Sequence, residues 1–308
     1  MATQTTAPTV PAPPRPPAHR ASAAQRFGDS GGVINVFSQA FLIIWTALVV
    51  LPLAWAVMSA FKSDKEILST PFSLPSSLRF GNFGRAWVSG HIGQYFLSTV
   101  IVITGGVFFT MLLGSMAAYV LARYSFPGNR VVYYFFVAGL AFPVFLGLAP
   151  LFSIMYKAHL LNTYHGLILV YVAYSLPFTV FFMHSFFRTL PTTVAEAALV
   201  DGASHTKLFF RVMLPMARPG LISVGIFNVI GQWNQFLLPV ALMQKQSAFD
   251  PDRSVLTQGL ISLTINSGYK SDWSGLFAAM TMAMLPILVI YVVFQRQVQA
   301  GLTAGTLK

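Results

Sequence analysis

The chain has 308 residues, of which 55% are hydrophobic and 9% charged, whereas about a quarter of the residues in an ordinary soluble domain are charged. This composition excludes an ordinary soluble globular protein and indicates an integral membrane protein in contact with lipid. The formal net charge is +11, but no nucleic-acid partner is expected, because the basic residues stand singly between apolar runs and form no stripe.

Residues 1–35 form the first segment of the chain and are rich in Pro, Ala, Thr and Ser. They contain no continuous apolar run, so they do not resemble a signal peptide. Proline at this density favours extended polyproline conformations over packed structure. We therefore predict a disordered, Pro/Ala-rich cytosolic tail over residues 1–35 and a transmembrane domain over residues 36–308.

Six apolar stretches follow, each long enough to cross a bilayer as a helix, which takes about 20 residues. They span residues 36–60, 95–122, 131–155, 166–187, 221–243 and 276–294. The sequence therefore predicts an all-α fold with six transmembrane helices. In the second stretch, Gly114 and Ala118 are small enough to let another helix approach closely.

Prolines stand inside five of the six stretches. They are Pro52, Pro143, Pro150, Pro177, Pro239 and Pro286. Each removes one backbone hydrogen bond and is expected to kink its helix. In a membrane such kinks are tolerated where neighbouring helices or water in a cavity satisfy the freed carbonyl groups. The prolines therefore favour a bundle around a pathway over a simple membrane anchor.

The distribution of basic residues predicts how the helices are oriented. With the N-terminus in the cytosol, eleven of the 19 Lys and Arg lie in cytosolic segments and the other eight lie outside. Because Lys and Arg are enriched in cytoplasmic loops, we expect a multi-pass protein of the cytoplasmic membrane with both termini in the cytosol. The segment between the fourth and fifth stretches then also lies in the cytosol.

This segment, residues 191–220, is more polar than its neighbours and is predicted to form two short helices. Thr193 stands three residues before Glu196, which is the spacing of a capping box, so the first helix is expected over residues 194–200. Gly202 follows this helix and can adopt the left-handed conformation that ends a helix at least cost.

Ser204 is expected to cap the second helix. This helix should end before Pro215, because proline disfavours the helical conformation in the residue ahead of it. The first helix carries a small and nearly flat face of Ala197, Ala198 and Leu199. Such a face suits a groove on another protein, since little side-chain entropy is lost on docking.

Three groups of residues in this segment occur in the order Glu196-Ala197-Ala198, Asp201-Gly202-Ala203 and Leu214-Pro215. They resemble the EAA loop in permease subunits of ATP-binding cassette (ABC) importers, in its carbohydrate-uptake (maltose-type) form. Further pieces that resemble this family occur in the expected order: Ala118-Tyr119-Val120-Leu121-Ala122-Arg123 before Phe126-Pro127-Gly128, Leu160-Leu161-Asn162-Thr163, Leu176-Pro177-Phe178, Trp233-Asn234 with Phe236, and Gly301-Leu302-Thr303-Ala304-Gly305. The last two resemble the smaller permease subunit of maltose-type systems in particular, and the resemblance covers nearly all of the chain after residue 36.

The resemblance implies a type I ABC importer permease fold in which residues 191–220 form a coupling helix that docks into a cytosolic ATPase subunit. Closure of the ATPase dimer on ATP would then swing the membrane helices between outward-open and inward-open states. The implied partners are a second permease subunit in a heterodimer, an ABC ATPase dimer and an extracytoplasmic sugar-binding protein, and the implied cargo is a sugar, in the first place an oligosaccharide. The implied coupling residues are Glu196, Ala197, Ala198, Leu199, Asp201, Gly202, Ala203, Leu214 and Pro215.

Polar side chains inside a membrane helix are costly and usually face a partner helix or a wet cavity. The fifth stretch holds the densest set: Asn228, Gln232, Trp233, Asn234 and Gln235. Amides can pair with sugar hydroxyls and a Trp ring can stack on a pyranose, so these residues are candidates for a substrate pathway. Two alternatives stay open: the amides bond to neighbouring helices within the bundle, or the sugar binds mainly to the partner permease.

No cofactor or metal is expected. The six histidines include no pair at metal-ligand spacing on one helix, and the absence of cysteine excludes thiolate sites and disulfides. The sequence lacks a Gly-x-x-x-x-Gly-Lys-Ser/Thr phosphate-binding loop. ATP is therefore expected to bind to a separate ATPase subunit, and the chain is predicted not to be an enzyme.

Other functions make different demands on the sequence. A permease of the same superfamily for another polar solute, such as glycerol phosphate, would place arginines along the pathway, and the apolar stretches contain almost none. A secondary transporter would need ionisable residues in the membrane and inverted repeats, neither of which we find. A membrane-embedded enzyme would need clustered His, Asp or Glu at a membrane face.

Overall fold

A computed structural model describes residues 32–303, apart from residues 246, 248 and 271. Over these residues the chain is helical and contains no strand, which confirms the all-α prediction. The predicted tail lies outside the described residues up to residue 31, and its last four positions belong to helix α2 (Gly32–Ser59). The chain divides into two compact parts, residues 1–54 and 55–308, with the boundary inside α2.

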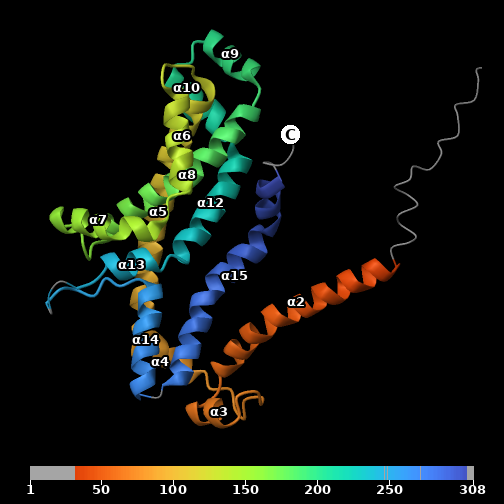
Figure 1. Ribbon diagram of the computed structural model, residues 1–308, viewed down its shortest axis with the longest axis vertical. Coiled ribbons are helices and arrows are strands. Elements are labelled where there is room, and N and C mark those ends of the chain that lie inside the picture. The colour runs from red at the N-terminus through yellow and green to blue at the C-terminus, as the bar shows by residue number, and fades with distance from the viewer. Residues whose placement is uncertain (1–31, 246, 248, 271, 304–308) are drawn as a thin grey trace, which may run out of the picture. The chain divides into compact units, whose positions relative to one another are not determined.

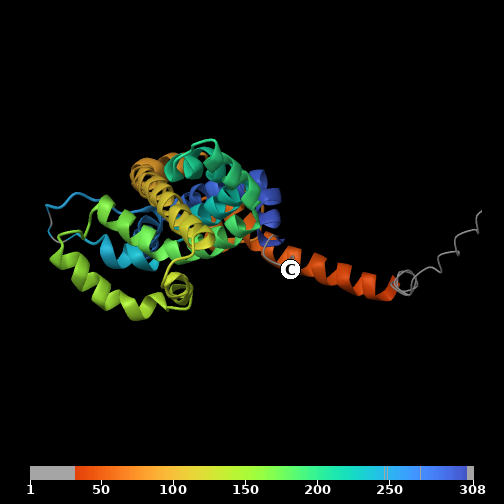
Figure 2. The same ribbon diagram turned by 90° about the horizontal axis from the view of Figure 1, so that it is seen from above.

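The second part contains a series of helices. In Figure 1, α9 and α10 lie at one end of this part and α3 and α4 at the other, and Figure 2 shows α7 and α13 together on one side of the bundle. The helices are α3 (Asp64–Ser69), α4 (Gly81–Val88), α5 (Ile92–Arg123), α6 (Asn129–Leu140), α7 (Val144–Lys157), α8 (Tyr164–Thr189), α9 (Thr192–Val200), α10 (His205–Leu208), the π-helix η1 (Phe209–Met213), α11 (Leu214–Met216), α12 (Arg218–Trp233), α13 (Leu237–Leu242), α14 (Leu256–Lys270) and α15 (Trp273–Thr303).

Four of the described helices are long and apolar enough to cross a membrane: α2, α5, α8 and α15. Two bent pairs of helices pass the same test together. The pairs are α6 with α7, bent by 103°, and the run His205–Met216 with α12, bent by 77°. The described residues therefore contain up to six spans by length and composition, in agreement with the predicted number when each bent pair counts as one span.

Residues 131–155 were predicted to form one span kinked by prolines, and the break at Pro143 is sharper than a kink. The helix stops at Leu140, and a new one starts after Pro143, which stands in an extended conformation at the start of α7. Proline cannot donate a backbone hydrogen bond and disfavours helix in Phe142 ahead of it. At this position the two effects divide the span instead of bending it.

Residues 221–243, for which a kink at Pro239 was predicted, are also divided, because α12 ends at Trp233 and α13 begins at Leu237. Pro239 has no N–H to donate to the carbonyl of Gln235, four residues earlier. That carbonyl instead accepts a hydrogen bond from the Thr257 hydroxyl at 3.1 Å. A contact with a distant segment thus satisfies the group that the proline leaves free, as the membrane requires.

The centre of the bundle is formed by α5, α8 and α12, with α5 packed along α8 and α12 in contact with both. A Cβ atom added to Gly114 of α5 would lie 2.6 Å from the Thr179 methyl carbon of α8. Ala118, one turn later, is fully buried. The predicted close approach of a second helix at Gly114 and Ala118 is therefore confirmed.

The end of the bundle that holds α3 and α4 is built around a buried lysine. Lys62 is fully buried, and its ammonium group donates hydrogen bonds to the carbonyl oxygens of Thr70 at 3.1 Å and Pro71 at 2.9 Å. The Asn82 side chain donates to the Lys62 carbonyl at 2.8 Å. Burying a charge is costly unless it is hydrogen-bonded, so these carbonyls hold the segment after α3 against the lysine.

A capping box begins α3 beside this lysine. The Ser63 hydroxyl accepts from the Glu66 amide, and the Glu66 carboxylate accepts from the Ser63 amide at 2.9 Å. Hydrogen bonds from the Ser63 amide, the Ser76 hydroxyl and the Ser63 hydroxyl lower the pKa of Glu66 to about 2. The carboxylate is therefore ionised and the box intact at neutral pH. Its contribution is present above the ordinary pKa of a glutamate and is lost as the pH falls towards 2.

We expect Lys62→Met to destabilise this end of the protein by about 2 to 3 kcal/mol, because the carbonyl groups of Thr70 and Pro71 lose a charge-assisted donor. The measurement is the thermal unfolding temperature of the purified protein in detergent. Lys65→Met, at an exposed position nearby, removes the same charge and should leave that temperature unchanged. Equal unfolding temperatures for the two variants would contradict the role of Lys62.

Candidate coupling knob and membrane cavity

Residues 191–217 form a compact projection, here called the knob, at the end of the bundle that carries α9 and α10 (Figure 1). Its first helix, α9, begins at Thr192 after Pro191, and no side chain caps its N-terminus. The predicted capping box between Thr193 and Glu196 is therefore wrong. Because proline forces Leu190 into an extended conformation, the chain turns at Leu190 and Pro191, and the helix starts two residues earlier than expected.

The turn after α9 confirms the predicted role of Gly202. This residue adopts φ +80°, and its amide donates to the carbonyl of Leu199 at 3.0 Å while the Ala203 amide donates to that of Ala198 at 3.0 Å. The pair of bonds is a Schellman motif, which requires a left-handed residue at the position of Gly202. Ser204 then accepts from the Lys207 amide at 3.3 Å, which confirms it as the cap of α10.

The second helix of the knob does not end before Pro215, contrary to the prediction. The helical run continues from α10 through the π-helix η1 into α11, where Pro215 occupies the first turn. The Leu214 amide donates to the carbonyl of Phe209, five residues earlier. This wider π-type pairing lets the chain carry a proline without leaving the helical path.

The exposed surface of α9 differs slightly from the predicted face. Glu196, Ala197 and Leu199 are exposed, but Ala198 is half-buried and packs against the knob's own core. Val200, which the sequence did not single out, is 87% exposed. The outward surface of the knob is thus small, largely apolar and bordered by one carboxylate. Such a surface is suited to docking in a cleft.

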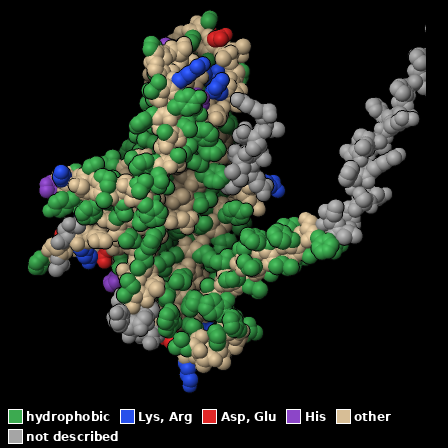
Figure 3. Space-filling model, in the orientation of Figure 1, with side chains coloured by type: hydrophobic (Ala, Val, Ile, Leu, Met, Phe, Trp, Pro, Cys, Tyr) green, Lys and Arg blue, Asp and Glu red, His purple; other side chains and the backbone are tan. Residues whose placement is uncertain are grey.

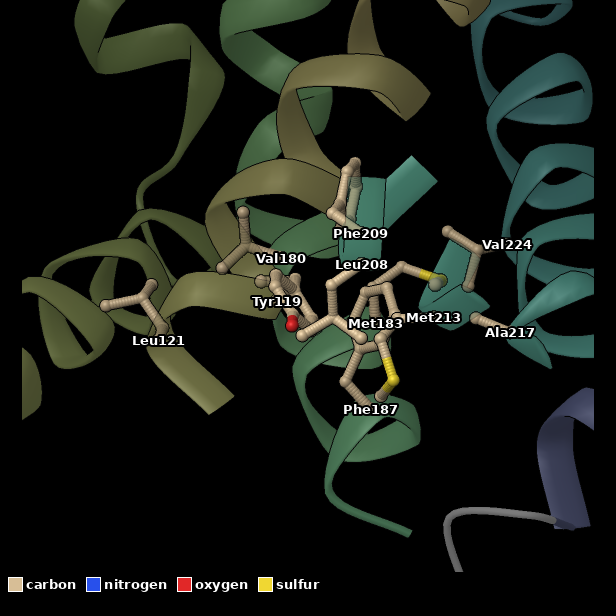
Figure 4. Packing of buried hydrophobic residues seen from close by; sticks show 11 residues of the cluster. Tyr119, Leu121, Val180, Met183, Phe187, Leu208, Phe209, Met213, Ala217 and Val224 are labelled. Carbon is tan, nitrogen blue, oxygen red and sulfur yellow. The ribbon is translucent and has the colours of Figure 1, made fainter. Parts of the chain in front are cut away.

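The knob rests on a buried cluster at the ends of α5 and α8. Figure 4 shows Phe209 and Leu208 of the knob beside Tyr119 of α5 and Phe187 of α8. The ring centroids of Tyr119 lie 5.4 Å from Phe187 and 5.1 Å from Phe209. Each buried side chain of this size contributes roughly 1.5 to 3 kcal/mol. The second half of the knob is therefore firmly packed against α5 and α8. This packing could not be predicted from the sequence, because the aromatic residues lie in three separate segments.

A cavity of about 320 Å³ lies between the two helix breaks described above. It is lined by Gly139, Leu140, Phe142, Tyr171, Tyr174, Ser175, Pro177, Phe178, Phe227, Asn228, Gly231, Gln232 and Gln235. Of the five predicted pathway residues, Asn228, Gln232 and Gln235 thus line it. Its size and its mixture of aromatic rings with a few amides are typical of a small-molecule site.

The other two predicted pathway residues do not line the cavity. Trp233 is buried against α15, where its indole N–H donates to the carbonyl of Ala283 at 3.2 Å. Asn234 is exposed, and its amide donates to the Ile230 carbonyl of its own helix at 2.9 Å. Trp233 therefore belongs to the packing between α12 and α15, and Asn234 closes the end of α12.

Two amides in the cavity wall also bond to a neighbouring helix. The Asn228 side chain donates to the Thr179 hydroxyl at 2.9 Å, and that of Gln232 donates to the Ser175 hydroxyl at 3.2 Å. The alternative of helix-to-helix bonding is thus correct for these two donors. The side-chain oxygen of Gln232 is buried and has no hydrogen-bond partner among the described residues, so the wall retains an unused acceptor.

The aromatic part of the cavity was missed in the sequence. Tyr171, Tyr174 and Phe178 recur at helical spacing on α8, but within an apolar stretch such residues are indistinguishable from core. Phe142 joins them from the break after α6, and Phe227 joins them from α12. Among the described residues, no group of His, Asp or Glu could hold a metal ion.

Comparisons with known proteins agree on the kind of protein this chain resembles. Residues 110–303 match the family described as "Binding-protein-dependent transport system inner membrane component". A diacetylchitobiose uptake system permease protein of Streptomyces coelicolor is 51% identical over 94% of this chain and 91% of its own length. A second diacetylchitobiose uptake permease of the same organism is 31% identical over 84% of this chain and 92% of its own length. The fold is similar to that of a chain in a bacterial ABC transporter that imports alginate, with TM-score 0.75, 20% identity and coverage of 87% of this chain and 97% of that one.

Proposed function

Because the chain belongs to the family of binding-protein-dependent transport system inner membrane components, we propose that it is a permease subunit of an ABC importer for a disaccharide that carries acetamido groups. The observation that carries this proposal is the 51% identity to a diacetylchitobiose uptake permease over nearly the whole chain. The aromatic and amide lining of the cavity supports a neutral sugar, because rings stack on pyranose faces and amides bond to hydroxyl and acetamido groups. The chain acts as a transporter component and not as an enzyme.

The proposed partners are a second permease subunit, a dimer of ABC ATPase subunits that binds the ATP, and an extracytoplasmic sugar-binding protein. The knob docks into a cleft of one ATPase subunit through the exposed part of α9. Ala197, Leu199 and Val200 supply the apolar contact and Glu196 a charge at its border. Asp201 to Ala203 and Leu214-Pro215 keep the two halves of the knob at a fixed angle.

We place the knob on the cytosolic side of the membrane. Basic residues gather at the end of the bundle that carries α9 (Figure 3), and the chain segments there supply Arg123, Arg130, Arg188, Lys207, Arg211 and Arg218. Basic residues favour the cytosolic side. With six spans, both termini then lie in the cytosol and Lys62 at the outer face.

Uptake of radiolabelled diacetylchitobiose by cells that lack the gene for this chain tests the proposal. Uptake should be lost and should return with the gene supplied on a plasmid, whereas uptake of glucose should not change. Loss of maltose uptake with normal diacetylchitobiose uptake would overturn the cargo and keep the permease function. Unchanged uptake of every polar solute tested would overturn both.

A further inference from the structure

Helix α9 carries the exposed surface of the knob and yet is weakly anchored by its own side chains. None of its residues is fully buried, and only partly buried side chains such as Ala195 and Ala198 touch the core. Its position therefore depends on the chain at its two ends. The Schellman turn at Gly202 fixes one end, as described above, and the other end is the elbow at Leu190 between α8 and α9.

The elbow is held by Arg123, the last residue of α5. The Arg123 guanidinium donates a hydrogen bond to the carbonyl oxygen of Leu190 at 2.5 Å. Leu190 follows the end of α8 and precedes Pro191, the residue before α9, so its carbonyl lies outside both helices. Arginine supplies a planar and permanently charged donor for such a group. The bond joins the end of α5 to the start of α9.

A second link joins Tyr124, the residue directly after α5, to the second half of the knob. The Tyr124 hydroxyl and His205 Nδ1 lie 2.9 Å apart, and the two rings meet edge to face at a centroid distance of 5.6 Å. Asn129 secures this end of α5 by donating to the carbonyls of Leu121 at 3.1 Å and Tyr124 at 2.8 Å. The residue before the knob and the knob's second half are thus bonded to two adjacent residues, Arg123 and Tyr124 respectively.

The same helix reaches the cavity. A Cβ atom added to Gly106 of α5 would lie 2.4 Å from the Gln232 side-chain oxygen, so α5 backs directly onto this part of the cavity wall. The Asn228 amide also contacts the Met111 sulfur at 3.4 Å. Gly106 lies 17 residues before Arg123, or about 25 Å along the helix. Helix α5 is therefore one continuous body between the knob and two amides of the cavity.

We propose that Arg123, with Tyr124, forms a clasp that makes the knob and α5 move as one rigid body, so that displacement of α9 by the ATPase is transmitted to the cavity wall at Gln232. Arg123 acts as a positioning residue, since it belongs neither to the cavity lining nor to the exposed surface of α9. This inference rests on the proposed function of the knob as the docking site of the ATPase. The clasp also gives a role to the end of the segment Ala118 to Arg123, which resembles the permease family but had no function assigned to it.

The test compares Arg123→Met with Arg130→Met in the complete importer reconstituted in proteoliposomes. Arg130 is exposed at the same end of the bundle, so the control removes the same charge and leaves the Leu190 bond. Arg123→Met should still co-purify with the ATPase and hydrolyse ATP, but it should import several-fold less diacetylchitobiose per ATP. Arg123→Lys keeps a charged donor and should restore part of the sugar imported per ATP hydrolysed. Arg130→Met should import as much sugar per ATP as the wild type.

Distance measurements provide a readout that general destabilisation does not produce. Because the chain has no cysteine, spin labels can be placed through Leu113→Cys on α5 and Thr193→Cys on α9, both at exposed positions outside the docking surface. With the clasp intact, the distance between the labels should be the same with and without ATP. With Arg123→Met it should change when ATP binds.

Each possible outcome bears on the clasp. An unchanged ratio of sugar to ATP in Arg123→Met, or an unchanged label distance, would overturn it. If Arg123→Met fails to assemble, Tyr124→Phe serves as the test, because it removes only the hydroxyl group. A normal amount of sugar imported per ATP in Tyr124→Phe would overturn the clasp and leave Arg123 a purely structural residue. A wild-type complex that imports no sugar at all would instead contradict the proposed function.

Discussion

Replacement of Gly202 by proline is expected to abolish sugar uptake while the membrane bundle still folds. Gly202 has φ +80°, whereas proline is fixed near −65°, so the Schellman turn between α9 and α10 cannot form. Proline also removes the amide that donates to Leu199. The turn lies on the outer surface of the knob, and the bundle core below it would be unaffected. The measurements are uptake of labelled diacetylchitobiose and ATP hydrolysis by the reconstituted importer.

Two alanine variants separate loss of the turn from backbone strain. No atom lies within 4 Å of a Cβ added at Gly202 or at Gly128, and both residues have positive φ. Alanine at either position therefore costs roughly 1 to 2 kcal/mol in backbone strain without a clash. Gly202→Ala should reduce uptake partially, and Gly128→Ala, outside the knob, should not. Normal uptake together with normal ATPase association in Gly202→Pro would refute the coupling function of the knob.

The knob illustrates what local sequence patterns can predict. The turn at Gly202 and the cap at Ser204 were predictable because each depends on a few adjacent residues. The start of α9 was predicted wrongly because two local signals competed, and the extended conformation ahead of Pro191 prevailed over a capping box at Thr193 and Glu196. The clasp at Arg123 could not be predicted, since its partner carbonyl is 67 residues away.

The sequence alone did not show which prolines would end a membrane helix. Pro177 and Pro286 lie inside continuous helices, whereas Pro143 and Pro239 follow helix breaks, although all four lie in similar apolar stretches. At Pro239 the break is accompanied by the bond from Thr257 to a carbonyl that the proline leaves free. A proline predicts a weakened helix, but contacts with distant segments decide whether the helix ends.

The residues of the cavity could be predicted from the sequence only in part. Three of the five polar residues proposed for the pathway do line it, because polar side chains in a membrane helix turn toward a partner or a cavity. Trp233 does not, because the polar and apolar sides of a helix cannot be assigned from one short stretch with amides on several faces. The cavity is lined by residues from the ends of α6 and α12 together with α8, and the kinks predicted from the sequence did not place these two helix ends beside each other.

Filling this cavity from its wall is expected to block transport. Gly231 lines the cavity, and no atom lies within 4 Å of a Cβ added there, so Gly231→Leu places a branched side chain in the free volume without a steric clash at Cβ. Uptake of diacetylchitobiose should fall severely, while assembly of the complex should be unchanged. Gly225→Leu is the matched control, because Gly225 lies on the same helix with equal free space and does not line the cavity.

Gly231→Ala separates obstruction of the cavity from stiffening of the helix. Replacing glycine by alanine inside a helix stabilises it by roughly 1 kcal/mol, and alanine and leucine have similar helix propensities. If a stiffer α12 were the cause, Ala and Leu at this position would reduce uptake equally. If obstruction is the cause, the loss should grow with side-chain volume, so that Ala has a small effect and Leu a large one. Uptake that is normal with Leu at position 231 would show that the sugar does not pass through this cavity.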